Sequence, residues 1–288
     1  MRVIVFGATG LLGNALMRTW KNDEVIGLSQ NDADIRNPEQ VQSCFTRFQP
    51  DWAALAAAYT DVDGCETNPE LAFAVNSRGA ANVAVAARQH KARLLFVSTD
   101  YVFDGLKGTP YEVTDACAPR SIYGKSKAEG EIKVSEILPD CCIVRTSWLF
   151  GLGGRCFPDA ILGLAAIRRE IAVVTDQRGC PTYNDDLASA IVELCRKHAS
   201  GIIHATNAGD CTWFDFASEI IAANGLKTTI RETTSDEFKR PAERPRYSVL
   251  SPASLGAFGL QMPSWQDALN PCCHKSLPTR NLSWAGWA

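Results

Sequence analysis

Short apolar runs alternate with longer amphipathic segments along the first half of the chain. The short runs have the length of buried strands, and the longer segments repeat apolar residues at helical spacing. The predicted strands are residues 2–6, 24–28, 52–58, 93–98, 141–146 and 171–175. The predicted helices are residues 11–20, 38–47, 69–90 and 122–138. This alternation predicts an α/β fold with right-handed crossovers, in which a doubly wound parallel sheet carries helices on both faces.

Two local signals refine this pattern. Asn37 and Pro38 supply an N-cap and a first-turn proline for the second helix. The strand at 52–58 is ambiguous, because its run of alanines suits a helix equally well.

After about residue 148 the elements become shorter, and prolines and glycines interrupt them. We therefore expect a first domain over residues 1–150 and a smaller, mixed lobe over residues 151–270, with discontinuous contributions. Such a lobe would lie over the carboxyl edge of the sheet, where open α/β folds bind ligands. Within it we predict helices capped by Asn184 and Thr212. Residues 271–288 have no readable periodicity, and we expect a poorly ordered tail.

Composition and charge narrow the class of protein. The chain has 288 residues, 46% of them hydrophobic, which suffices for one large domain or a large and a small one. The net charge is −3 with no basic stripe, so nucleic acid and membrane surfaces are not expected partners. No secretory-signal pattern and no bilayer-length apolar run occurs. We expect a cytoplasmic protein.

The eleven cysteines do not suggest disulfides or a metal site. Their number is odd, no C-x-x-C occurs, and Cys44, Cys65, Cys142 and Cys195 fall in apolar patterns. Reduced cysteine behaves as a small buried hydrophobe. The four histidines are scattered, so we expect no bound metal.

A glycine-rich turn joins the first predicted strand to the first helix. Gly7, Gly10 and Gly13 stand at the spacing G-x-x-G-x-x-G. Glycine is needed where the backbone turns tightly, approaches a pyrophosphate, or packs helix on strand. The helix start at Leu11 and Leu12 offers free amides and a positive dipole end to phosphates. In this position the turn predicts a Rossmann-type dinucleotide-binding domain.

The choice between NADH and NADPH is less clearly encoded. NAD-selective sites usually place Asp or Glu at the end of the second strand, to hold the adenosine ribose hydroxyls. Here Ser29 stands near that point, and Arg36 lies further along the chain. No charge clearly repels or attracts a 2′-phosphate, which favours NADPH or the use of both cofactors. Asp34 and Ile35 form a candidate adenine contact, although a polar loop before the next helix explains them equally well.

Tyr123 and Lys127 are candidate catalytic residues, because a spacing of four places both on one helix face. A free tyrosine loses its proton near pH ~10, and a nearby lysine cation lowers that pKa. Thr99, just beyond the fourth predicted strand, adds a hydroxyl. Together these groups can pass a proton to a carbonyl oxygen while a hydride arrives from elsewhere. The spacing is common by chance, and its combination with the glycine turn carries the prediction.

The glycine turn with the Tyr123–Lys127 pair resembles the extended short-chain dehydrogenase/reductase superfamily. Within it, several strings resemble the dTDP-4-dehydrorhamnose reductase family over about residues 1–270. They are residues 56–63, 98–105, 123–127, 145–148, 176–182 and 244–250. The resemblance implies NAD(P)H-dependent reduction of the C4 ketone of a dTDP-4-keto-6-deoxy-L-sugar, in nucleotide-sugar and cell-surface polysaccharide biosynthesis.

The resemblance also implies roles for particular residues. Tyr123 would donate the proton, Lys127 would bind the nicotinamide ribose and lower the pKa of Tyr123, and Thr99 would hold the substrate oxygen. The cofactor-contacting stretch beyond the third strand would be Ala58, Tyr59 and Thr60. The substrate contacts would be Thr99, Asp100, Tyr101 and Trp148, with Arg244 and Arg246 meeting the diphosphate. Trp148 has an ordinary alternative as a residue packed between lobes, and the two arginines have one as solvated cations.

Particular residues argue against the activities of related proteins. Related 4,6-dehydratases carry Glu where this chain has Tyr101, so elimination is not expected. A nucleotide-sugar 4-epimerase uses a similar Tyr–Lys pair but generally carries an acid after the second strand, where Ser29 stands. A non-catalytic subunit like the regulatory β subunit of methionine adenosyltransferase shares the string at 101–105. Retention of the proton-transfer residues favours catalysis over that binding role.

The resemblance also implies a possible homodimer. Family members can dimerise through a magnesium ion held by glutamates. Two corresponding positions hold Ala15 and Asp185 here, which argues against the magnesium-bridged form.

Overall fold

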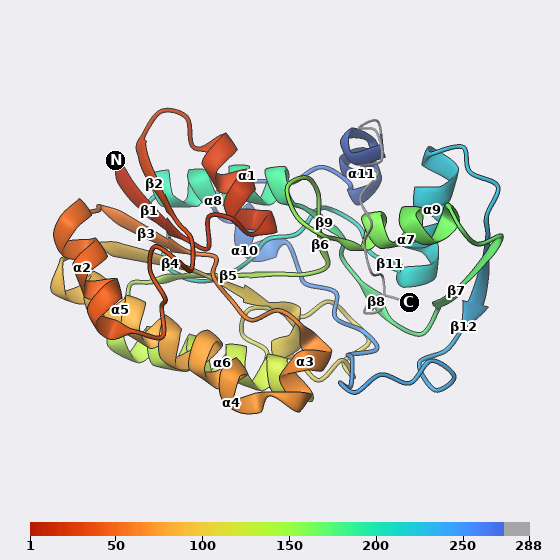
Figure 1. The fold of residues 1–288 in the computed structure, drawn as a ribbon, viewed down its shortest axis with the longest axis horizontal. Coiled ribbons are helices and arrows are strands. Elements are labelled where there is room, and N and C mark those ends of the chain that lie inside the picture. Colours follow the sequence, from red (N-terminus) through yellow and green to blue (C-terminus); the bar gives the residue numbers. More distant parts are fainter. Residues whose placement is uncertain (274–288) are drawn as a thin grey trace.

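The chain forms a large lobe around an open sheet and a smaller lobe beside it (Figure 1). This computed structural model describes the backbone of residues 1–273 and the side chains up to residue 269. Within that part of the chain, no helix is both long enough and apolar enough to cross a membrane. The last helix continues through Cys273, and the rest of the tail predicted over 271–288 lies outside the described residues.

The large lobe is built on a six-stranded sheet in the order β10-β5-β4-β3-β1-β2, in which all neighbours are parallel. Its strands are β1 (Arg2–Phe6), β2 (Glu24–Leu28), β3 (Trp52–Leu55), β4 (Arg93–Thr99), β5 (Cys142–Thr146) and β10 (Gly201–His204). Strand β1 pairs with β2 on one side and β3 on the other, so the winding reverses there. A doubly wound sheet binds ligands at this point, outside the carboxyl ends of its strands.

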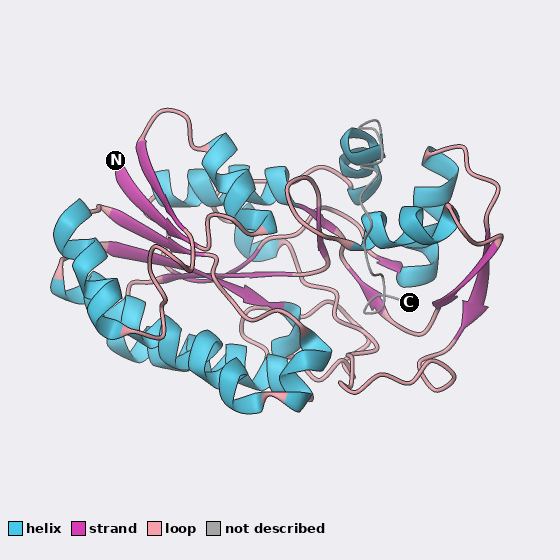
Figure 2. Ribbon diagram, in the orientation of Figure 1, coloured by secondary structure: helices cyan, strands magenta, loops and turns pink. Residues whose placement is uncertain are grey.

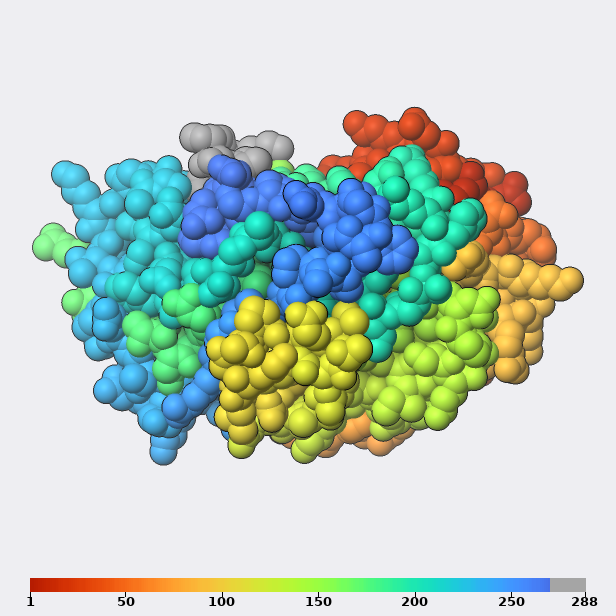
Figure 3. All heavy atoms as spheres, turned by 180° about the vertical axis from the view of Figure 1, so that it is seen from behind, coloured from red at the N-terminus to blue at the C-terminus, as the bar shows by residue number. Residues whose placement is uncertain are grey.

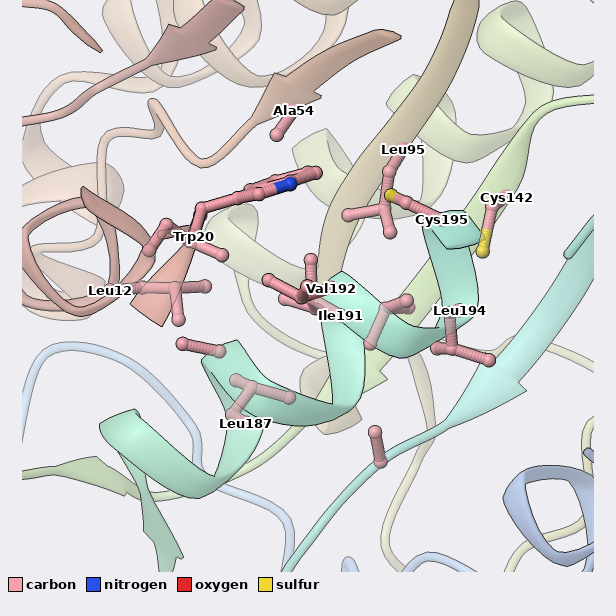
Figure 4. Close-up of a cluster of buried hydrophobic side chains, with 14 of the residues drawn as sticks. Leu12, Trp20, Ala54, Leu95, Cys142, Leu187, Ile191, Val192, Leu194 and Cys195 are labelled. Atoms are coloured by element: carbon pink, nitrogen blue, oxygen red, sulfur yellow. The ribbon is translucent and has the colours of Figure 1, made fainter. Parts of the chain in front are cut away.

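Helices cover both faces of this sheet, as Figure 2 shows. One face carries α1 (Leu11–Thr19) and α8 (Asn184–Arg196), and the other carries α2 (Pro38–Phe48), α5 (Ala80–Gln89) and α6 (Ile122–Ile137). In Figure 4, Leu12 of α1 and Ile191 of α8 lie in one apolar cluster with Ala54 and Leu95 of the sheet. Each layer buries its own cluster, and this burial holds the helices on the sheet.

Short elements follow β3 and β4. The segment after β3 contains α3 (Val62–Thr67), α4 (Pro69–Phe73), the π-helix η1 (Ala74–Gly79) and then α5. The helix predicted over 69–90 is therefore continuous, but its middle winds as a π-helix, a form often found at functional sites. The 3₁₀ turn η2 (Asp100–Val102) follows β4.

The smaller lobe contains three two-stranded sheets and three helices among the described residues. The helices are α7 (Phe157–Ala165), α9 (Trp213–Ala223) and α11 (Trp265–Cys273). The strand pairs are β12 (Thr229–Thr233) with β7 (Glu170–Val174), β11 (Cys211–Thr212) with β8 (Arg178–Gly179), and β6 (Leu149–Phe150) with β9 (Thr182–Tyr183). As predicted, Thr212 caps α9, where its side chain accepts a hydrogen bond from Asp215 N. The cap predicted at Asn184 is wrong, because Tyr183 is the N-cap of α8 and the Asn184 side chain donates to Leu11 O and Leu152 O. This helix also packs on the main sheet and not in the smaller lobe.

Two strand predictions require correction. The strand predicted over 171–175 exists as β7, but it pairs with β12 in the smaller lobe. The sixth strand of the main sheet is instead β10, which pairs with β5. Four residues are too few to reveal a periodic pattern, so the sequence did not indicate β10. The strand predicted over 52–58 ends at Leu55, which leaves Ala58 in the following loop.

A late segment of the chain returns along the large lobe. Tyr111 N donates to Val249 O at 2.8 Å, and Ser251 N donates to Tyr111 O at 2.8 Å. Figure 3 shows the two segments in contact from behind, yellow against blue. The short helix α10 (Ala253–Gly256) then packs beside β10. With α8 and β10, residues beyond 150 thus contribute to both lobes.

Candidate active site

Most of the predicted site residues lie at the carboxyl ends of strands. Gly7 follows β1, Ser29 follows β2, Ala58 lies beyond β3, Thr99 ends β4 and Trp148 lies beyond β5. Because the strands are parallel, these ends meet at one edge of the sheet. The fold therefore gathers residues that are far apart in the sequence.

The glycine turn has the close backbone approach that its spacing predicted. Gly7 has a φ of +84°, and a Cβ there would lie 2.6 Å from Ala57 N. A Cβ on Gly13 would overlap Gly7 O, to which Gly10 N donates at 3.0 Å. Helix α1 has no side-chain cap at Gly10 and no acidic residue in its first turn. Its first amides therefore suit an anion, and the turn fits the pyrophosphate of a dinucleotide.

The end of β2 carries a negative charge that the sequence did not indicate. Gly7 N and Ala8 N donate to Leu28 O, at 2.9 and 3.1 Å, so Ser29 stands beside the glycine turn. Asp32 folds back from the next turn, and its Oδ2 accepts from Ser29 N at 2.8 Å and from Ser29 Oγ at 2.6 Å. A carboxylate thus lies at the strand end although the residue there is serine.

Asp34 and Ile35 form the following turn. Arg36 Nε donates to both carboxylate oxygens of Asp34, at 2.9 and 3.0 Å, so the arginine is paired within its own loop. Ile35 packs beneath η1, since a Cβ on Gly79 would lie 2.8 Å from Ile35 Cγ1. The loop is therefore shaped by its own contacts, and its contact with adenine stays a prediction.

Asn76, which no sequence pattern indicated, joins the predicted cofactor loop to α6, the helix that carries Tyr123. It lies in η1 and is 1% exposed. Its Oδ1 accepts from Tyr59 N at 2.8 Å, and its Nδ2 donates to Tyr59 O and to Ser126 Oγ, both at 3.0 Å. Ser126 Oγ in turn donates to Tyr123 O at 2.8 Å. No motif marks such a residue, because most of its partners are backbone atoms of other elements.

Thr99, Tyr101 and Tyr123 form one cluster. The hydroxyl groups of Thr99 and Tyr123 lie close enough for Thr99 to act on the pKa of Tyr123. Thr99 Oγ1 also accepts from Tyr101 N at 3.2 Å, and the rings of Tyr101 and Tyr123 meet edge-on with centroids 5.5 Å apart. Gly124 permits this approach, because a Cβ there would overlap Tyr101 O. The structure therefore brings together the predicted proton donor and its hydroxyl partner.

The pKa of Tyr123 is shifted in the direction opposite to the sequence prediction. Burial raises the pKa of Tyr123, and the interaction with the Thr99 hydroxyl lowers it only in part. Lys127 Nζ donates to Val97 O at 2.6 Å and lies 4.0 Å from the centre of the Phe96 ring. Burial also lowers the pKa of Lys127 to about 7. The net shift of the Tyr123 pKa is thus upward in the chain by itself, because desolvation dominates, and an effect of Lys127 on that pKa stays a prediction.

Asp100 lies at the same strand end and is 1% exposed. Burial raises its pKa to about 6, although hydrogen bonds from Ser248 and Thr99 oppose the shift. Its charge therefore changes close to neutral pH.

Trp148 packs where the two lobes join. Its indole stacks on that of Trp213 with ring centroids 3.6 Å apart and planes 7° from parallel. Its φ is +45°, which is rare for a bulky residue. Gly179 makes room for it, because a Cβ there would lie 2.6 Å from the indole. The packing role is evident, and contact with a substrate stays a prediction.

The two candidate diphosphate-binding arginines lie in different environments. Arg244 Nη1 and Nη2 donate to the Asp63 carboxylate of α3 at 3.1 and 3.0 Å. Arg240 Nε and Nη2 donate to the same group at 2.9 and 2.7 Å. Burial opposes the ionisation of Asp63, but these cations outweigh it and lower the pKa of Asp63 to about 2.

The charges of Arg244 and its neighbour Arg240 both act on Tyr101 of the candidate catalytic cluster. Burial raises the pKa of Tyr101 to about 12, and the charge of Arg244 opposes this shift. The side chain of Arg246 is 63% exposed, with Asp236 3.8 Å away. Nothing in the sequence distinguished the two arginines.

The side chains described by the structure contain no group of three or more His, Cys, Asp or Glu that could hold a metal ion. Ala15 is buried in α1, and Asp185 pairs with Arg18 at 2.6 Å. The described cysteines are free thiols, and all of them except Cys117 are buried.

The switch point, the glycine turn and the Thr99–Tyr123–Lys127 cluster together define a dinucleotide-binding protein of the short-chain dehydrogenase/reductase type. A family model described as the RmlD substrate binding domain matches residues 1–277, and the chain belongs to this family.

Known proteins resemble the chain over nearly its whole length. The spore coat polysaccharide biosynthesis protein SpsK of Bacillus subtilis is 40% identical over 270 residues, 93% of this chain and 95% of the relative. The crystal structure of a dTDP-4-dehydrorhamnose reductase from Clostridium acetobutylicum matches with a TM-score of 0.92 and 37% identity, over 94% of this chain and 98% of that one. A dTDP-4-dehydrorhamnose reductase from Bacillus anthracis, solved in complex with NADP, also has a TM-score of 0.92, with 39% identity over 94% and 98% of the two chains.

Proposed function

We propose that the protein reduces the C4 ketone of a dTDP-4-keto-6-deoxy-L-sugar with NADH or NADPH, as a dTDP-4-dehydrorhamnose reductase giving dTDP-L-rhamnose. The neighbouring side chains of Thr99 and Tyr123 carry this proposal, because they lie at the sheet edge that also holds the glycine turn. Two similar solved structures bear the name of that reductase, and one of them binds NADP. In this proposal residues 1–150 provide the dinucleotide site and residues 151–270 provide most of the substrate lobe.

The residues of the cluster divide the chemistry between them. Bound NAD(P)H would supply the hydride to C4. Thr99 holds the C4 oxygen, and Tyr123 donates its phenolic proton as negative charge develops on that oxygen. Burial favours proton donation by Tyr123, because its raised pKa keeps the phenol protonated at neutral pH. Lys127 would bind the nicotinamide ribose.

Other residues would hold the substrate. Asp100, Tyr101 and Trp148 would contact the sugar, and Arg244 would meet the diphosphate with charge-assisted hydrogen bonds. Tyr101 offers no carboxylate base, which disfavours elimination. We further propose a cytoplasmic homodimer without a bridging magnesium ion, since Ala15 and Asp185 are a poor ligand set.

The test follows the loss of NADH or NADPH absorbance with dTDP-4-keto-6-deoxyglucose and the matching epimerase. Tyr123→Phe should lower kcat by about 10²–10⁴ and leave the Kd of the cofactor unchanged, because only the transferred proton is lost. Tyr247→Phe is the matched control, since it removes a half-buried phenol outside the cluster, and it should retain activity.

Absence of turnover with both cofactors would reject the proposal. If the protein instead purified with a stoichiometric partner and showed no reductase activity, a regulatory binding subunit would be the better description.

A further inference from the structure

We propose that Asp32 occupies the place of a 2′-phosphate and thereby sets the cofactor preference of this chain towards NADH. The proposal rests on the dinucleotide site proposed above and goes beyond it by naming the residue that discriminates between the two cofactors. It differs from the preference for NADPH or the use of both cofactors that the residue at the strand end, Ser29, suggested.

The position of Asp32 is defined by two hydrogen bonds. Its Oδ2 accepts from Ser29 N at 2.8 Å and from Ser29 Oγ at 2.6 Å. The turn that carries it is closed by Asp32 N donating to Ser29 O at 3.1 Å. Ser29 follows Leu28, whose carbonyl oxygen accepts from Gly7 N and Ala8 N of the glycine turn. The carboxylate therefore lies where Rossmann-type sites bind the adenosine ribose.

The two hydrogen bonds have a consequence for a 2′-phosphate. A backbone N–H and a hydroxyl at the end of the second strand are donors that a phosphate oxygen could accept from. Asp32 uses both of them for its own carboxylate. The hydroxyl and the amide of Ser29 lower the pKa of Asp32, so it is ionised at neutral pH. A 2′-phosphate would have to displace this anion, whereas a 2′-hydroxyl can donate to it.

The other charged residues of this loop do not offset the repulsion between the Asp32 carboxylate and a 2′-phosphate. Arg36 is the cation of this loop, and its guanidinium is bound to the Asp34 carboxylate. A shallow pocket at this end is lined by Asp34, Arg36 and Glu39, among others. With Asp32, this part of the chain carries three carboxylates and one guanidinium, and like charge disfavours a dianionic group.

The test measures binding of NADH and NADPH separately by calorimetry, with no sugar present. We expect the wild-type chain to bind NADH more tightly than NADPH. Asp32→Ala removes the charge and frees both donors of Ser29, so the Kd for NADPH should fall by about tenfold or more. The Kd for NADH should rise or stay within about threefold, because one hydrogen bond to the ribose is lost. Asp32→Asn removes the charge and keeps an acceptor, so its effect should be intermediate.

Two control variants separate the proposed role of Asp32 from a general effect of charge and from phosphate binding by Arg36. Asp140→Asn changes the net charge equally, in an exposed loop before β5 at the amino edge of the sheet, and should leave both Kd values unchanged. Arg36→Ala should change the Kd for NADPH by less than about threefold, because Arg36 is already paired.

An unchanged ratio of the two Kd values in Asp32→Ala would overturn the inference. A loss of NADPH binding of about tenfold in Arg36→Ala would also overturn it, by assigning the phosphate to the arginine. Failure to bind either nucleotide would reject the inference together with the cofactor site. Because no sugar is used, a chain that binds both cofactors but reduces no keto sugar rejects only the proposed reaction.

Discussion

Burial controls the charges of the candidate catalytic groups. It raises the pKa of Tyr123, raises that of Asp100 to about 6 and lowers that of Lys127 to about 7. Each shift favours the neutral form, since desolvation penalises charge whatever its sign. A protonated phenol is the form that a reductase requires, so the site favours proton donation over proton removal.

The buried Lys127 predicts a specific dependence of stability on pH. Its pKa is about 7 in the folded chain and near 10.5 when unfolded, so between these values the unfolded chain binds more protons. The contribution of Lys127 to folding therefore becomes more favourable as pH rises, by at most about 1.4 kcal/mol per pH unit. Lys127→Met should stabilise the cofactor-free chain most near pH ~7, and this advantage should shrink towards pH ~10.

Urea unfolding of both proteins at several pH values measures the effect. The cysteines titrate in both proteins, so the difference between the two free energies of unfolding isolates Lys127. A difference that does not vary with pH would contradict the lowered pKa of the buried Lys127 ammonium.

At the scale of elements, the π-helix η1 connects the two halves of the site. It places Asn76 between the Tyr59 loop and α6, and a Cβ on Gly130 of α6 would overlap Asn76 O. The helices are therefore in close backbone contact at this point. This contact holds the predicted cofactor loop and the candidate catalytic residue Tyr123 in a defined relation.

Asn76→Ala should lower the free energy of unfolding by roughly 2–4 kcal/mol, because it leaves Tyr59 N and Tyr59 O without their partners. It should also raise the Kd of NAD(P)H, since the Tyr59 loop loses its anchor. Thermal or urea unfolding and cofactor titration measure the two effects. Asn82→Ala, which removes one half-buried hydrogen bond to Ile35 O, is the control and should cost about 1 kcal/mol. Equal costs for the two variants would argue against a special role of Asn76.

At the scale of the whole molecule, a few polar contacts tie the late segment of the chain to the large lobe. The Asp63 carboxylate of α3 accepts hydrogen bonds from Arg240, Arg244 and Ala242 N. The nearby ion pair between Arg120 and Glu243 is more exposed. Asp63 has a pKa of about 2, lower than its ordinary value of 3.8. Its contribution to stability is therefore present above about pH 4 and is lost only as pH falls towards 2.

Asp63→Ala should raise the KM for the nucleotide sugar by about tenfold, because Arg244 loses its partner and its fixed position beside Tyr101. The Kd of the cofactor should not change. Hydrogen exchange should accelerate in residues 238–246. Glu243→Gln breaks the exposed ion pair in the same segment and should cost less than about 1 kcal/mol with no change in KM. A parallel loss of cofactor binding in Asp63→Ala would show that the contact supports the large lobe instead of the substrate site.

The sequence by itself determined the features that depend on neighbouring residues. The strands at 2–6 and 24–28 have the predicted bounds, and the helix carrying Tyr123 and Lys127 ends within one residue of prediction. The glycine turn was predictable because the steric demand at Gly7 and Gly13 belongs to the local backbone. Thr99 and Tyr123 were identified by their chemistry and by the order of the elements.

Only the tertiary structure decided which strands share a sheet, where charge accumulates and how strongly each group is buried. The predicted sixth strand, β7, pairs with β12 outside the main sheet, and β10 is the sixth strand of that sheet instead. Strand pairing depends on contacts between distant segments. Asp32 supplied the carboxylate that Ser29 lacks, through a turn that no motif specifies. The pKa of Tyr123 is raised although the Tyr123–Lys127 spacing predicted a lowering, because desolvation depends on everything packed around a side chain, and the spacing of two residues on one helix contains no information about it.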